Sequence, residues 1–245
     1  RSSLVGATKF KYTPNHREGI AVSITTILFD AGDILYSKPR RKGVIAKFLT
    51  DRGYQAPSAK DPVEREMRLK AHAGKIGVQD FMEWLMDHYG VSDPAIVQEG
   101  VAMLRSQQSD VTFFVGVGET LHELKRRGFK LGVVTNTFNP PAEKAKWFET
   151  IGIDGIWDSY ADSCELGVIK PDPEIYLAAL DPLGVAPENA FFVGHAQYEI
   201  DGAKALGMTT IRFNPDPDCT VSDHLIARFP DLLDIAQMPS QSETG

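Results

Sequence analysis

Short runs of apolar, β-favouring residues recur along the chain, and segments with helical spacing lie between them. The apolar runs do not alternate with polar residues, which is typical of strands buried on both faces of a parallel sheet. The predicted strands cover residues 24–29, 130–134, 190–193 and 208–213. The predicted helices between or after them cover residues 119–127, 141–150, 172–183 and 200–206. This alternation predicts a doubly wound α/β domain.

Residues 36–110 follow a different pattern, because they contain four amphipathic helical segments and no predicted strand. These helices are expected at residues 44–52, 62–73, 78–89 and 93–106. We therefore predict a three-layer, Rossmann-like parallel-sheet core at residues 22–36 and 111–237. An all-helical cap, residues 37–110, interrupts that core after its first strand. Residues 1–21 and 238–245 are predicted to be terminal tails.

Composition narrows the class of protein. Of 245 residues, 42% are hydrophobic and 24% are charged, as in an ordinary globular protein and unlike a disordered, collagen-like or coiled-coil chain. The 26 basic and 33 acidic residues give a net charge of −7, which opposes binding to nucleic acid or anionic lipid. No apolar run reaches the roughly 18 residues that would span a bilayer.

The expected location and partners follow from these features. Cys164 and Cys219 form no CxxC pair, and no signal peptide is visible, so we expect a cytoplasmic protein. A few basic residues in one cleft can reverse the local field of an acidic chain. We expect a small anionic substrate, no nucleic acid, no membrane and, at most, a second copy of the chain in a homodimer.

Polar residues that could take part in a reaction lie after the predicted strands and in the loop before one predicted helix. Parallel sheets carry their functional sites at the carboxyl ends of the strands. The segments are Asp30-Ala31-Gly32-Asp33-Ile34 after the first strand, Thr135-Asn136 after the second, Lys170-Pro171-Asp172-Pro173 before the helix at 172–183, and Gly194-His195 through Glu199 after the third.

Taken together, these segments resemble the haloacid dehalogenase-like hydrolase superfamily over about residues 25–213. In that family the first strand ends in a nucleophilic Asp, usually within DxD followed by Gly and Thr. The second strand ends in Ser or Thr, a Lys precedes Pro-Asp-Pro, and a last acidic motif holds Mg²⁺. The helical insert matches the mobile cap of the family.

The resemblance implies roles for individual residues. Asp30 would be the nucleophile of a covalent intermediate that water then hydrolyses. Thr135, followed by Asn136, would donate a hydrogen bond to a transferring phosphoryl oxygen, and Lys170 would neutralise charge on nucleophile and substrate. Mg²⁺, which prefers oxygen ligands, would be held by Asp30, the Gly32 carbonyl and Glu199.

Three positions depart from the family pattern. Gly32 stands where phosphatases carry the second Asp, their general acid and base. Asp33 comes one position later, and because side chains alternate along an extended segment it is not expected to inherit that role. Ile34 replaces the Thr. His195 replaces the first acid of the last motif, and imidazole is a poor Mg²⁺ ligand but a good ligand for transition metals.

Further residues are candidates beside this site. His195 would serve as a general base that activates water, or else bond within its loop. Gly32 and Asp33 are expected to contact the substrate. Arg40 and Arg41, at the start of the cap, would meet an anionic substrate or form a solvated helix start. The other five histidines lack ligand spacing and are interpreted as structural or surface residues.

Three functions remain open at this point. The first is a metal-dependent phosphatase that acts on a small phosphorylated metabolite. The second is a carbon-centred hydrolase, of the 2-haloacid dehalogenase or epoxide-opening type, in which His195 aids water activation. The third is a catalytically silent binding module that kept the scaffold, because the fold alone does not establish turnover.

Overall fold

A six-stranded parallel sheet forms the centre of the molecule in the computed structural model, which describes residues 23–38, 41–58 and 61–237. The strand order is β5-β4-β1-β6-β7-β8. The strands are β1 (Thr26–Phe29), β4 (Lys130–Thr135), β5 (Ser159–Asp162), β6 (Ala190–Gly194), β7 (Thr209–Phe213) and β8 (His224–Ile226). Phe29 pairs in register with Val133 and Val193, so the three central strands end at one edge. The predicted doubly wound fold is confirmed.

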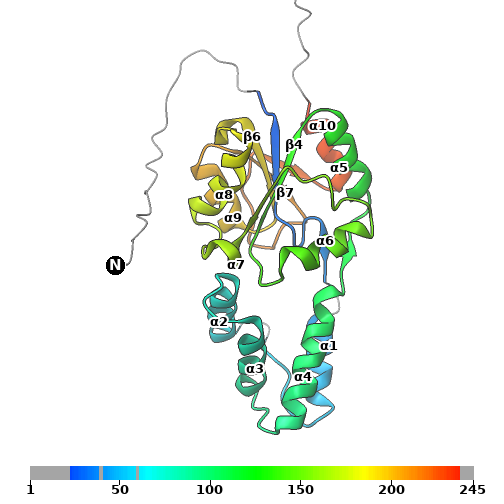
Figure 1. Cartoon of the computed structure of the whole chain (residues 1–245), viewed down its shortest axis with the longest axis vertical. Coiled ribbons are helices and arrows are strands. Elements are labelled where there is room, and N and C mark those ends of the chain that lie inside the picture. The colour runs from blue at the N-terminus through cyan, green and yellow to red at the C-terminus, as the bar shows by residue number, and fades with distance from the viewer. Residues whose placement is uncertain (1–22, 39–40, 59–60, 238–245) are drawn as a thin grey trace, which may run out of the picture.

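Helices cover both faces of the sheet, because successive strand residues point to opposite sides. Ile27 and Phe29 pack in one apolar cluster with α5 (Val117–Arg126), α6 (Pro141–Glu149) and α10 (Leu232–Ile235). Leu28, between them, packs in a second cluster with α8 (Pro173–Leu180) and α9 (Gln197–Ala205). Figure 1 shows these two helical layers on either side of the strands.

Four helices form the cap and have an apolar core of their own, which includes Leu49, Met86 and Leu104. They are α1 (Arg41–Thr50), α2 (Pro62–His72), α3 (Val78–His88) and α4 (Pro94–Ser106). The chain enters and leaves the cap through β2 (Tyr36–Ser37) and β3 (Thr112–Phe113), which pair antiparallel. The cap lies beyond the end of the core that carries α6 and α7 (Figure 1).

The end of α2 contacts α7 (Ser163–Leu166) of the core. Ser163 Oγ donates a hydrogen bond to the His72 carbonyl over 2.7 Å and accepts one from the Thr137 amide over 2.9 Å. Gly74, with φ of +64°, has so little room that a Cβ there would lie 2.6 Å from the Cys164 carbonyl oxygen. The cap therefore rests on the core in a close backbone contact.

The structure contains elements that the apolar pattern did not predict. β5 has the sequence Ser-Tyr-Ala-Asp, which is too short and polar to stand out, and β8 is a three-residue edge strand. β2 and β3 have two residues each. Helix α9 begins at Gln197 rather than at residue 200, and the other predicted helix boundaries likewise lie within three residues of expectation.

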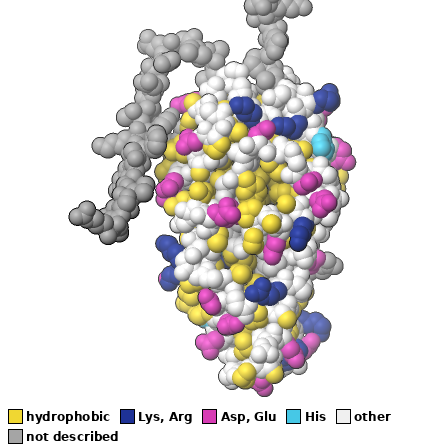
Figure 2. All heavy atoms as spheres, viewed as in Figure 1, with side chains coloured by type: hydrophobic (Ala, Val, Ile, Leu, Met, Phe, Trp, Pro, Cys, Tyr) yellow, Lys and Arg dark blue, Asp and Glu magenta, His cyan; other side chains and the backbone are white. Residues whose placement is uncertain are grey.

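The surface carries charges of both signs. Figure 2 shows acidic and basic side chains interspersed over one face of core and cap, with apolar side chains between them. Among the residues that the structure describes, no helix combines the length and the apolar character needed to cross a membrane.

Candidate active site

Asp30 follows the central strand β1 and is 5% exposed. Its Oδ1 accepts a hydrogen bond from Lys170 Nζ over 2.6 Å, and its Oδ2 lies 3.4 Å from Nε2 of His195. Burial by itself raises the pKa of this carboxyl, but the Lys170 ammonium and the His195 ring outweigh it and hold the pKa well below its usual range. Asp30 is therefore an anion, the form in which a carboxylate acts as a nucleophile.

Lys170 is 1% exposed and connects two buried carboxylates. Its Nζ lies 2.6 Å from Asp30 Oδ1 and 2.9 Å from Glu199 Oε1. Burial favours the neutral amine, yet the two carboxylates together raise the pKa of Lys170 above its ordinary value. The side chain is thus a fixed positive charge beside the nucleophile.

The loop that carries Lys170 is positioned by its neighbours. Asn136 Oδ1 accepts a hydrogen bond from the Lys170 amide over 2.9 Å. Gly202 lets α9 approach, because a Cβ there would lie 2.8 Å from Pro171 Cβ and 2.9 Å from the Tyr176 hydroxyl. Asn136 was expected among the catalytic residues, beside Thr135. The structure shows it lining the cavity while its side chain fixes the backbone of Lys170.

Thr135 ends β4, next to β1, and bonds to a second buried lysine. Lys144, on α6, is 1% exposed and donates from Nζ to Thr135 Oγ1 over 2.8 Å. Because Oγ1 accepts this bond, the Thr135 hydroxyl proton remains available for a substrate oxygen. Burial, partly opposed by Asp162 and Asp30, lowers the pKa of Lys144 to about 7.

His195 follows β6 and lies between two carboxylates. Its Nε2 is 3.4 Å from Asp30 Oδ2, and its Nδ1 is 3.3 Å from Asp216 Oδ1, without hydrogen-bond alignment at Nδ1. Burial lowers the pKa of His195, but the bond to Asp30 and the charges of Asp30, Glu199 and Asp216 raise it to about 9. An imidazolium donates protons, so this geometry does not favour the expected general-base role.

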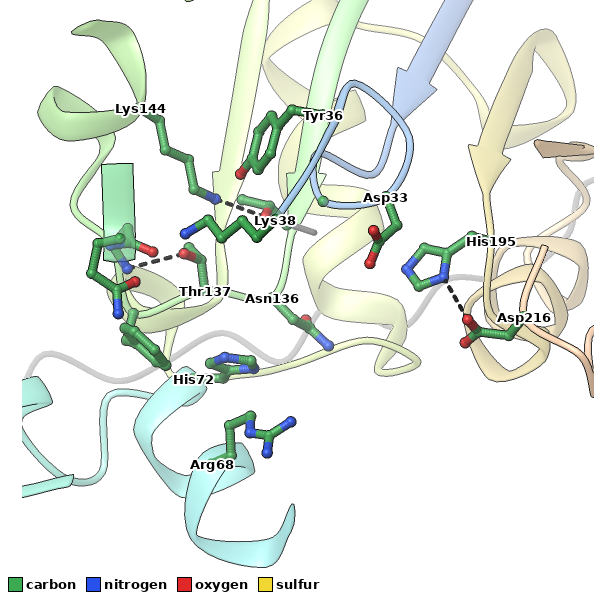
Figure 3. Close-up of a pocket in the computed structure, with 15 residues that line it drawn as sticks. Asp33, Tyr36, Lys38, Arg68, His72, Asn136, Thr137, Lys144, His195 and Asp216 are labelled. Atoms are coloured by element: carbon green, nitrogen blue, oxygen red, sulfur yellow. Dashed lines mark hydrogen bonds and ion pairs between the residues drawn. The ribbon is translucent and has the colours of Figure 1, made fainter. Parts of the chain in front are cut away.

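Gly32 and Asp33 form a turn directly after the nucleophile. Asp33 has a φ of +57°, a left-handed conformation that Asp tolerates better than most residues. Its amide donates to the Tyr36 carbonyl over 2.7 Å, and its carbonyl accepts from Asn214 Nδ2 over 3.0 Å. The side chains therefore do not alternate as in an extended strand, and Figure 3 shows the Asp33 carboxylate directed toward the His195 ring.

A cavity of about 610 Å³ opens beside these residues, between core and cap. Its volume is typical of a site for a small ligand. Core residues that line it include Gly32, Asp33, Thr135, Asn136 and His195, and α2 contributes Arg68 and His72. His72, which was interpreted as a structural or surface residue, lies in this lining. Arg40 and the side chain of Arg41 lie outside the described residues.

Three side chains at this site offer ligand atoms to a divalent cation. Asp30, His195 and Glu199 each offer a ligand atom, and these atoms lie within 4.8 Å of one another. Glu199 Oε2 is buried and has no hydrogen-bond partner among the described residues, as expected of an oxygen that would coordinate a cation. The carboxylate oxygens of Asp30 and Glu199 suit Mg²⁺, while the His195 nitrogen does not.

The family model described as haloacid dehalogenase-like hydrolase matches residues 24–207. The chain belongs to the haloacid dehalogenase-like hydrolases. Among related hydrolases, a glyceraldehyde 3-phosphate phosphatase of Methanopyrus kandleri is 29% identical over 233 residues, covering 87% of this chain and 97% of the relative. The (S)-2-haloacid dehalogenase 4A of Burkholderia cepacia is 31% identical over 111 residues, covering 45% of this chain and 47% of the relative.

Solved structures agree on the fold of this hydrolase. The crystal structure of a predicted phosphoglycolate phosphatase from Haemophilus somnus 129pt matches with a TM-score of 0.64 and 22% identity, covering 89% of this chain and all of that one. At this identity the match shows the fold alone.

Several residues at the site of the hydrolase were not identified from the sequence. Lys144 shares the buried face of α6 with Trp147 and Phe148, so a lysine at an apolar position was the available signal. Asp216 lies in the loop after β7, at the same edge as the other motifs, where its strand-end position was informative. Lys38 and Arg68 carry no such signal, because only the packing of the cap brings them to the cavity.

Proposed function

We propose that this protein is a phosphatase that hydrolyses a small phosphorylated metabolite through a covalent intermediate on Asp30. One observation carries the proposal: an anionic, buried Asp30 is held 2.6 Å from Lys170 and 3.4 Å from His195, and His195 lines a cavity of about 610 Å³. The match along nearly the whole length of a curated phosphatase supports it, whereas the dehalogenase match covers less than half of either chain.

The geometry supports a two-step reaction. Asp30 attacks phosphorus, the bond to the substrate alkoxide breaks, and an aspartyl-phosphate forms. Water then attacks phosphorus, which releases inorganic phosphate and restores the carboxylate. Lys170 offsets negative charge on Asp30 and the phosphoryl group throughout, and the Thr135 hydroxyl donates to a phosphoryl oxygen.

The leaving group presents the main difficulty, because Gly32 supplies no acid. Loss of a general acid or base typically costs about 10²–10⁴ in rate. We infer that substrates with good leaving groups, such as acyl phosphates or aryl esters, suffer least. His195 faces the nucleophile as an imidazolium, so it supplies positive charge there rather than a base.

We also propose that Mg²⁺ assists this site, held by Asp30, the Gly32 carbonyl and Glu199. The unpartnered Glu199 Oε2 supports this ligand set. A bound cation would polarise a phosphoryl oxygen and neutralise developing charge. His195, beside Asp30, adds a competing positive charge, so we expect weaker Mg²⁺ binding than an acid at this position would give.

A substrate panel tests the proposal. Wild type, Asp30→Asn and the exposed control Asp154→Asn are incubated with phosphate esters and with 2-haloacids, each in Mg²⁺ or in EDTA. We expect phosphate release that needs Asp30 and is lost in EDTA, with Asp154→Asn equal to wild type. Halide release that persists in EDTA would replace this reaction by a dehalogenation. Absence of all turnover in wild type would favour a binding module.

A further inference from the structure

The charges that line the cavity are separated into two ends. Asp33, His195 and Asp216 lie together at one end, and Lys38 and Lys144 lie at the other (Figure 3). The protein as a whole carries a net charge of −7, and the face in Figure 2 mixes both signs. The cations at one end of the cavity are therefore a local feature and not part of a generally basic surface.

Lys144 is the buried centre of the positive end. It is 1% exposed, and among the described residues the Thr135 hydroxyl is the single hydrogen-bond acceptor of its Nζ. Asp162, the carboxylate that raises the pKa of Lys144 most, forms no ion pair with it in the described part of the chain. Asp162 Oδ2 also has no hydrogen-bond partner there. An ammonium has three N–H donors, so this one retains donors for a ligand.

Lys38 brings positive charge to the same end, and Arg68 brings it to the cap side of the cavity, below His72 (Figure 3). Lys38, just after β2, lies with Nζ 4.7 Å from the centre of the Trp147 ring and close enough to Lys144 to repel it. Arg68 reaches the cavity from α2, where Glu64 accepts a hydrogen bond from its Nη2. Arg68 Nε is buried and has no hydrogen-bond partner among the described residues.

This arrangement exceeds what the scissile phosphoryl group requires. That group lies against Asp30, where Lys170 already supplies a buried positive charge. Clustered cations repel one another, and a buried ammonium with unfilled donors is costly, so the cluster is stabilised by an anion bound among its members. Thr135 touches Lys144 and ends the strand next to Asp30, which connects the two positions.

We propose that the end of the cavity formed by Lys38 and Lys144 binds a second anionic group of the substrate, a carboxylate or a second phosphate. The inference rests on the proposed function and narrows its substrate class to small phosphate esters with two anionic groups. Lys144 holds the group from the core, and Arg68 adds positive charge to the cavity from the cap.

Binding to a variant that cannot turn over tests this proposal separately from catalysis. Asp30→Asn is titrated by calorimetry with 2-phosphoglycolate, with ethylene glycol bisphosphate and with ethyl phosphate, which lacks a second anion. We expect at least one of the first two to bind at least tenfold more tightly than ethyl phosphate, and the better of them identifies the second group. Equal affinities for all three overturn the proposal.

Matched substitutions then assign the preference to residues. The ratio measured is the affinity for the better of the two ligands with a second anion, divided by the affinity for ethyl phosphate. In the Asp30→Asn background, Lys144→Met and Arg68→Met are each expected to reduce this ratio at least fivefold. Lys146→Met and Arg65→Met, exposed controls on the same two helices, should leave the ratio unchanged. A ratio that survives both Lys144→Met and Arg68→Met overturns the assignment. If the affinity ratio holds but wild type releases no phosphate, the subsite stands and the proposed reaction fails.

Discussion

The Lys170 ammonium lies 2.6 Å from Oδ1 of Asp30, in a part of the core where both side chains are almost fully shielded from water. Lys170→Met should lower kcat for phosphate esters by about 10²–10³, because the charge that offsets the nucleophile and the phosphoryl group is lost. It should also lower the free energy of unfolding by roughly 3–5 kcal/mol, since two buried carboxylates lose their partner. Steady-state kinetics and urea unfolding measure the two effects.

A double variant separates these effects. Lys170→Met combined with Glu199→Gln leaves Asp30 as the sole buried carboxylate of the original three-residue cluster. Part of the lost stability should return, while kcat stays low because the lysine cation is still absent and the proposed Mg²⁺ ligand Glu199 is lost as well. Recovery of kcat together with stability would mean that Lys170 acts on the fold and not on the reaction.

Gly32→Asp should restore the missing acid. A Cβ at Gly32 meets no atom within 4 Å, so the longer side chain has room at its base. We expect kcat for alkyl phosphates, whose leaving groups need protonation, to rise by about tenfold or more, and kcat for aryl phosphates to change little. Gly32→Asn has the same size without the acid and serves as the control. Equal gains in both variants, or equal gains on both substrates, would exclude acid catalysis at this position.

Lys144 should make the stability of the protein depend on pH. Burial lowers the pKa of Lys144 to about 7, whereas a lysine in the unfolded chain titrates near 10.4. Between these values the unfolded chain binds the extra proton, so this residue costs most stability below about pH 7, and the cost fades as the pH rises toward 10. Lys144→Met should therefore raise the free energy of unfolding by roughly 2 kcal/mol at pH 6, and by less at pH 9.

Urea unfolding at the two pH values measures this dependence, with the exposed Lys146→Met as the control that shows no such trend. A Lys144→Met protein that is equally or less stable than wild type at pH 6 would contradict the cost assigned to this charge.

Gly74→Ala should disturb the contact between cap and core. The new Cβ would lie 2.6 Å from the Cys164 carbonyl oxygen, and the left-handed backbone disfavours it as well. Gly90→Ala is a matched control, because Gly90 has φ of +79° and open space around it. Both variants should lose about 1 kcal/mol of stability from the backbone alone. KM should rise severalfold in Gly74→Ala only, and an equal KM in the two variants would show that this contact does not serve substrate binding.

The long apolar strands and amphipathic helices were predictable because the spacing of apolar residues within each segment indicates which side chains are buried. β1, β4, β6 and β7 contain apolar runs, and the sheet buries these runs on both faces. The sequence pattern did not predict β5 and β8, because these segments are strands through their pairing with neighbouring strands and not through their composition. An edge strand of three residues such as His224–Ile226 is stabilised by its neighbour β7, which no local window contains.

The candidate site was predictable where the chemistry follows a strand end. Asp30, Thr135 and Glu199 were identified on that basis, and Lys170 from the Lys-Pro-Asp-Pro segment before a helix. The fold places Lys170 in contact with both Asp30 and Glu199. The direction of the Asp33 side chain could not be predicted, because its left-handed φ departs from extended-strand geometry. The packing of the cap against the core brings further residues to the cavity. Because this packing is a tertiary contact, a single sequence does not reveal these residues.

The two covalent crossings between core and cap run side by side as the antiparallel pair of β2 and β3. Any displacement of the cap relative to the core would have to pass through this one ribbon. Arg68 and His72, both on α2, would then move together with respect to the cavity. A mutation at the ribbon would therefore alter both contributions of the cap to the cavity at once.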